Sequence, residues 1–137
     1  MKKRHIILSF FLSLLLVSTA QARVVEDVKV QSVPEGYQIT VRFLSQVQYR
    51  SHTPTDLAKE FYVQTLTMNF QNLTQEEVTA FRERVTLSWN ADTDADNDVP
   101  LREIIYEGND PERPQVLFFF TKDVNLEVRG SADLLSL

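Results

Sequence analysis

The chain has 137 residues, carries 14 Lys or Arg against 19 Asp or Glu, and contains no cysteine. Its formal net charge of −5 argues against nucleic acid, whose phosphates require a basic face, so we expect no nucleic-acid partner. The same charge gives no electrostatic attraction to anionic lipid. Without cysteine the fold has no disulfides, and a hydrophobic core must stabilise it.

Residues 1–22 have the features of a secretory signal peptide. A basic cluster at residues 2–4 precedes an apolar run over 6–17, and small residues at positions 20 and 22 end the segment. This order predicts cleavage after residue 22 and a periplasmic or secreted protein with a single domain over 23–137. The apolar run is shorter than the ~20 residues that cross a bilayer, so we expect no membrane span in the mature chain.

Most of the remaining chain alternates apolar and polar residues with a period of two, which is typical of strands with one buried face. Residues 37–43 show this pattern, and residues 47–50 continue it with the same parity. A third strand is predicted over 60–70, where the apolar positions change from odd to even numbers. We expect a β-bulge near Gln64 or Thr65 to reconcile the two parities.

One short helix is predicted between the strands. Thr74 is the expected N-cap, and Glu77 stands three residues later, as in a capping box. Val78 and Phe81 would share the buried face of this helix. The run 116–120 has no polar side, so we place it at the centre of a sheet, covered on both faces. The strands predicted after the helix are 85–89, 101–106, 116–120 and 124–128.

The sequence therefore predicts a mainly β protein, a small β-sandwich or rolled sheet of about 7–8 strands with one short helix. Residues 38–49 and 115–126 are also alike, at a constant offset of 77 residues. Each stretch has a strand that ends in Phe, a short corner, and the start of another strand. Two related β units would explain this likeness, and chance similarity between hairpins is the alternative.

Residues 28–128 resemble the AMIN domain, a small periplasmic β-sandwich at the N-terminus of cell-wall amidases and of some secretins. AMIN-like segments that precede helical repeats in exported bacterial proteins are similar too. The resemblance lies in the signal peptide, in strand 37–43 with its corner into 47–49, and in strand 116–120 with its corner into Val124. It implies a domain that binds peptidoglycan or positions an attached machine at the cell wall.

Polar side chains alternate along the first two of these strands, and we expect them to form one face that binds glycan or peptide. An ordinary solvated sheet face is the alternative interpretation. Arg42 and Arg50 are the strongest candidates, because guanidinium groups bind carboxylates such as those of peptidoglycan stem peptides. The predicted face consists of Gln38, Thr40, Arg42, Gln48, Arg50 and His52.

An acidic segment over 92–103 has the ligand spacing of a calcium-binding loop, with oxygen donors at positions 1, 3, 5 and 12. An EF-hand loop joins two helices, however, whereas this segment joins two predicted strands. A calcium-stabilised interaction module is therefore the alternative function, and a solvated acidic connection is the competing interpretation. The calcium ligands would be Asp92, Asp94, Asp96, Asp98 and Glu103, and no other cofactor is expected.

Catalytic residues are not indicated by the sequence. His52 is the one histidine beyond residue 22, and its neighbour Ser51 would point to the opposite face of a strand. That geometry does not form a hydrolytic triad, and one histidine without cysteine does not make a zinc site. We therefore expect a non-enzymatic exported domain that binds peptidoglycan or a cell-envelope protein.

Overall fold

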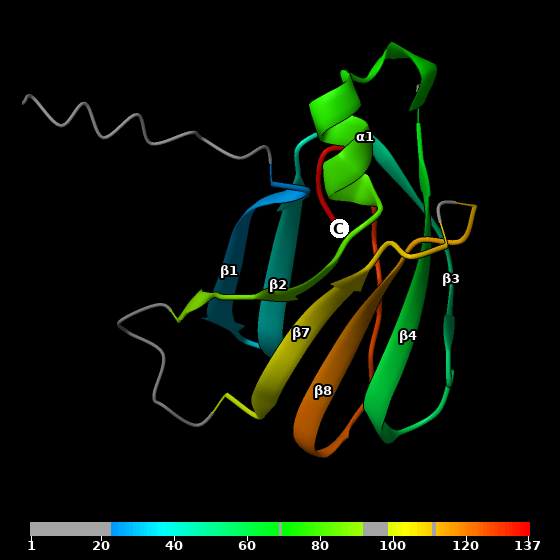
Figure 1. The fold of residues 1–137 in the computed structure, drawn as a ribbon. Helices are drawn as coiled ribbons and strands as arrows, with labels where there is room; N and C mark the ends of the chain where they lie inside the picture. The colour runs from blue at the N-terminus through cyan, green and yellow to red at the C-terminus, as the bar shows by residue number, and fades with distance from the viewer. Residues whose placement is uncertain (1–22, 69, 92–98, 111) are drawn as a thin grey trace, which may run out of the picture.

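The computed structural model describes residues 23–68, 70–91, 99–110 and 112–137. Within them the predicted mainly β fold with one short helix is confirmed (Figure 1). The strands of this part are β1 Val25–Val33, β2 Gly36–Phe43, β3 Val47–Thr53, β4 Ala58–Thr67, β5 Arg84–Leu87, β6 Asn90–Ala91, β7 Leu101–Glu107 and β8 Gln115–Val124. A 3-10 turn, Phe70–Asn72, and the helix α1, Gln75–Phe81, follow β4.

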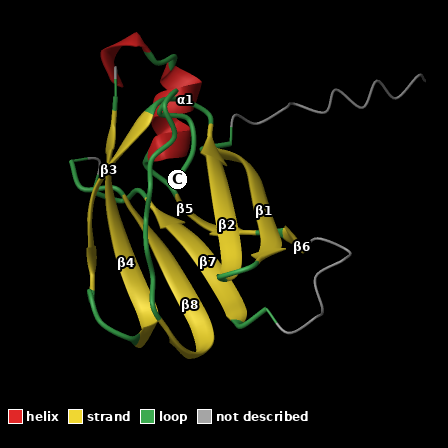
Figure 2. Ribbon diagram, turned by 180° about the vertical axis from the view of Figure 1, so that it is seen from behind, coloured by secondary structure: helices red, strands yellow, loops and turns green. Residues whose placement is uncertain are grey.

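The strands form two sheets that pack face to face. The smaller sheet has the order β2-β1-β6, and the larger has the order β3-β4-β8-β7-β5. Neighbouring strands are antiparallel except β1 and β6, which pair in parallel over two residue pairs. Figure 2 shows β1 and β2 in front of the larger sheet, with α1 at one end of the sandwich.

The end of the chain borders β2. The N–H of Val41 donates to the carbonyl of Leu137 at 2.9 Å, and the N–H of Phe43 donates to the carbonyl of Leu135 at 2.7 Å. These bonds satisfy backbone groups on the edge of β2 that would otherwise be open to pairing with another chain.

The hydrophobic core lies between the two sheets. Val30 and Val41 of the smaller sheet belong to the same buried cluster as Phe61, Ile104 and Val116 of the larger one. Burial of each such side chain contributes about 1.5–3 kcal/mol to the free energy of unfolding. Strand β8 occupies the centre of the larger sheet, which confirms the position predicted for the run 116–120.

A buried tyrosine joins α1 to the larger sheet. The hydroxyl of Tyr106 on β7 donates to the carbonyl of Phe81 at 2.8 Å, and the two rings meet edge to face at 6.3 Å. Burial raises the pKa of Tyr106 well above its ordinary value, so this phenol keeps its proton and remains a donor. The contact fixes the C-terminal end of the helix against the core.

The predicted bulge in β4 is wrong, because the irregularity lies in β3. Tyr49 pairs with Thr65 and Ser51 pairs with Gln64, so Arg50 is the extra residue. β4 keeps its odd-numbered positions inward through Thr65, which is buried. The Thr65 hydroxyl donates to the carbonyl of Pro114 at 3.1 Å, which compensates the burial of a polar group.

The predicted strand over 124–128 and the corner before it are also wrong. Residues 121–124 are the end of β8, and residues 125–130 have no regular secondary structure. The apolar side chains of Leu126 and Val128 nevertheless pack against the core. Their period of two therefore reflects an extended segment that docks on the sheet without pairing with it.

The start of α1 confirms the predicted capping box. The N–H of Glu77 donates to the Thr74 hydroxyl at 3.2 Å, and the N–H of Thr74 donates to the Glu77 carboxylate at 2.7 Å. We expect Thr74→Ala to lower the free energy of unfolding by about 1 kcal/mol, measured by urea denaturation.

Thr79→Ala is the matched control for this cap. Thr79 is exposed, and its hydroxyl donates to the carbonyl of Gln75 within the same helix, which does not satisfy a free backbone donor. We expect Thr79→Ala to change the free energy of unfolding by no more than about 0.5 kcal/mol. Equal losses of stability in Thr74→Ala and Thr79→Ala would contradict the stabilising role of the capping box.

Candidate functional site

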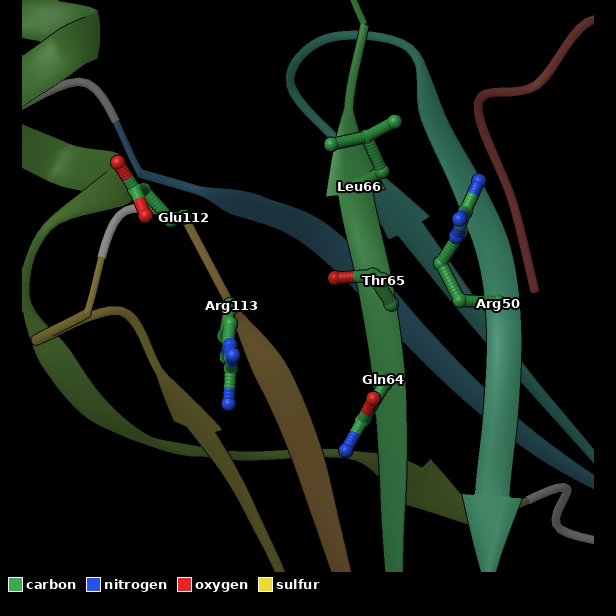
Figure 3. A pocket seen from close by; sticks show the side chains of 6 residues that line it. All are labelled: Arg50, Gln64, Thr65, Leu66, Glu112 and Arg113. Carbon is green, nitrogen blue, oxygen red and sulfur yellow. The ribbon is translucent and has the colours of Figure 1, made fainter.

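A shallow pocket of about 250 Å³ lies where β4 extends past the start of β8 (Figure 3). Gln64 pairs with Gln115, the first residue of β8, so the next residues of β4 have no partner in that strand. The turn before β8 and the edge strand β3 flank this part of β4. The residues that line the pocket are Arg50, Gln64, Thr65, Leu66, Glu112 and Arg113.

Local hydrogen bonds place the charged side chains of this pocket. The N–H of Glu112 donates to the Asp110 carboxylate at 3.1 Å, and the N–H of Arg113 donates to the Asp110 carbonyl at 3.0 Å. This turn brings Arg113 to one side of β4. The bulge in β3 brings Arg50 to the other side (Figure 3).

The two arginines of the pocket are exposed and unpaired within the described part of the chain. No carboxylate among the described residues lies within 4.0 Å of either guanidinium, and Glu112 likewise has no described cation that close. Arg42, by contrast, forms an ion pair with Glu26 at 3.3 Å. The pocket therefore offers two guanidinium groups to an anionic ligand.

The prediction that six polar side chains form one face is wrong. Residues 44–46 carry the chain from the smaller sheet to the larger one, so the six side chains are divided between the two sheets. Gln38, Thr40 and Arg42 lie on β2. Gln48, Arg50 and His52 lie on β3, and of the six only Arg50 lines the pocket.

Arg42 lies in a local network of charges. Besides its ion pair with Glu26, it is close enough to Asp133 to affect that carboxyl group. The pKa of Asp133 is lowered mainly by the hydrogen bond from the Ser131 hydroxyl, then by the N–H of Leu135, with a smaller contribution from Arg42. Arg42 is therefore less available to a ligand than Arg50.

His52 turns inward rather than outward. The extra residue at Arg50 shifts the parity of β3 by one, so His52 pairs with Val63 on the inner face. Its Nδ1 shares a hydrogen bond of 2.6 Å with the Tyr49 hydroxyl, and its ring lies 6.4 Å from that of Phe61. The histidine is a half-buried part of the sheet margin.

The candidate calcium ligands Asp92, Asp94, Asp96 and Asp98 lie outside the described residues. Glu103 is described, and it lies half-buried on β7 opposite Phe119 of β8. Within the described ranges, no three His, Cys, Asp or Glu side chains gather closely enough to hold a metal ion.

Sequence reasoning missed Gln64, Glu112 and Arg113. The outward parity of β4 would have placed Gln64 on the surface. The turn residues around Asp110 and Pro114, just before the apolar run 116–120, would have placed Arg113 at the end of the sheet. Arg50 and Arg113 are far apart in the sequence, so the sequence did not indicate that both lie beside β4.

A second hollow of about 440 Å³ lies between the first residues of β1 and the strand β5. Its walls include the buried side chains of Val24, Val25 and Val28. Two of its acidic residues already have partners, because Glu26 pairs with Arg42 and Asp27 lies 4.0 Å from Lys29. Arg23 and Glu83 also line this hollow, so it has one guanidinium group, whereas the pocket that contains Arg50 and Arg113 (the arginine pocket) has two.

No family model matches the chain, and no curated protein or solved structure matches it either. The helix that the structure describes is too short to span a membrane. The proposed function therefore rests on the chemistry of the pocket that contains Arg50 and Arg113.

Proposed function

We propose that the protein is an exported, non-enzymatic domain that binds peptidoglycan through the carboxylates of its stem peptides. The observation that carries this proposal is the pair of exposed guanidinium groups, Arg50 and Arg113, in one pocket of an acidic protein. Neither has an ion-pair partner among the described residues. Guanidinium groups bind carboxylates through two parallel hydrogen bonds, which gives both affinity and orientation.

The other lining residues support a peptide ligand. The side-chain amide of Gln64 has a donor and an acceptor for peptide groups, and Leu66 gives apolar contact. Glu112 supplies a carboxylate for an amino group on the same ligand. The predicted signal peptide would deliver this pocket to the compartment that contains the cell wall.

The experiment that tests the proposal is a calorimetric titration of the protein with a soluble stem peptide. We expect Arg50→Ala and Arg113→Ala each to weaken binding by about tenfold, because each removes a charge-assisted hydrogen-bonding group. Higher salt should weaken the wild-type interaction, since the site is exposed to solvent.

Arg42→Ala is the matched control, because Arg42 is an exposed arginine on the other sheet and is already paired with Glu26. We expect its affinity for the peptide to equal that of the wild type. An equal loss in all three variants would show that net charge matters rather than the pocket. If the stem peptide does not bind at all, the proposal fails, and an acidic segment of an envelope protein becomes the candidate ligand.

A further inference from the structure

Outward side chains continue from the pocket along β4. Tyr62, Gln64 and Leu66 point to the outer face of the larger sheet, and we call these three residues the β4 strip. Tyr62 and Leu66 are each 39% exposed, which is high for large apolar residues in a strand. Gln64 and Leu66 line the pocket, and Tyr62 lies two residues further along the strand, about 7 Å from Gln64.

An apolar floor extends sideways from Tyr62. Tyr62 pairs with Leu117 of β8, and Leu117 pairs with Ile105 of β7. Leu117 and Ile105 are only 8% and 7% exposed, so they pack closely beside Tyr62 and offer little surface of their own to a ligand. Figure 1 shows no helix or strand of the described residues over this face of the sheet.

Polar groups border the ring of Tyr62. Thr53 of β3 is its cross-strand partner, and the amide of Gln64 lies next along the strip. The ring also carries its own hydroxyl group. An aromatic face with a polar margin matches a sugar ring, which has an apolar C–H face and hydroxyl groups around its edge. A wholly apolar ligand would leave these polar groups without partners.

We infer that a sugar ring stacks on Tyr62 while carboxylates of the same molecule bind Arg50 and Arg113. The ligand is then a sugar-linked peptide rather than a peptide alone. This inference rests on the proposed function of the pocket, and it assigns the sugar to a separate part of the surface.

Two probes separate the sugar site from the peptide site: a muramyl tripeptide, and the same tripeptide without its sugar. We expect the wild-type protein to bind the muramyl tripeptide about tenfold more tightly, as measured by calorimetry. Tyr62→Ala should abolish this difference and leave the affinity for the bare tripeptide unchanged. Tyr62→Phe should retain most of the difference in affinity between the two probes, because the ring provides the stacking surface. Arg50→Ala should weaken the binding of both probes.

Tyr37→Ala is the matched control, because Tyr37 is 40% exposed but lies on β2 of the other sheet. It should preserve the affinity for both probes. Equal wild-type affinity for the two probes, or an unchanged difference in Tyr62→Ala, would overturn the sugar site. The arginine pocket would still stand if Arg50→Ala weakened binding of the bare tripeptide. Failure of both probes to bind would overturn the pocket and the sugar site together.

Discussion

Gly108→Ala is expected to destabilise the protein by about 3 kcal/mol, at the upper end of the usual cost of overpacking. A Cβ atom at this position would lie 2.0 Å from the carbonyl oxygen of Phe81 and 2.8 Å from Cε1 of Tyr106. The Phe81 carbonyl cannot move freely, because it accepts the hydrogen bond from Tyr106. Relief of the clash would therefore displace the end of α1 from the larger sheet.

Gly130→Ala is the control for this substitution. A Cβ atom on Gly130 would meet nothing within 4 Å. We therefore expect Gly130→Ala to change the free energy of unfolding by no more than about 0.5 kcal/mol. Urea denaturation of the two variants measures the difference directly. Wild-type stability of Gly108→Ala would show that α1 does not pack against β7 as described.

Phe61→Ala is expected to lower the free energy of unfolding by about 3–5 kcal/mol. Phe61 is 1% exposed and meets the ring of Phe120 edge to face at 5.9 Å. Its removal would leave a cavity between the two sheets, because the surrounding strands are held in place by their own pairing. Thermal or urea unfolding checks this value.

Tyr62→Ala is the neighbouring control, since Tyr62 lies on the opposite face of the same strand. We expect it to cost no more than about 1 kcal/mol, because the side chain is partly exposed. Similar losses for Phe61→Ala and Tyr62→Ala would contradict the inner and outer faces assigned to β4. A small loss also ensures that Tyr62→Ala is folded in the sugar-binding experiment.

The sequence allowed prediction of those elements in which local pattern and burial agree. β2 follows the alternation of residues 37–43, and β8 follows the apolar run 116–120. The helix start was predictable because the capping box involves only Thr74 and Glu77, which are close in sequence.

Long-range contacts determined the features that the sequence could not show. Thr65 lies inward because the carbonyl of Pro114, far along the chain, accepts its hydrogen bond. That arrangement preserves the parity of β4 and places the extra residue at Arg50 in β3, which in turn rotates His52 inward. The candidate site was predictable only in part: Arg50 was foreseen, whereas Arg113 reaches the pocket through the turn before β8.

Co-sedimentation of the protein with purified peptidoglycan is the most direct test of peptidoglycan binding. Parallel samples with calcium and with a chelator separate the arginine pocket from the acidic segment 92–103. We predict that the wild-type protein sediments in both samples and that the double variant Arg50→Ala, Arg113→Ala stays in the supernatant. Wild-type protein that stays in the supernatant in both samples would contradict the proposed function. Sedimentation only with calcium would favour the calcium-dependent alternative.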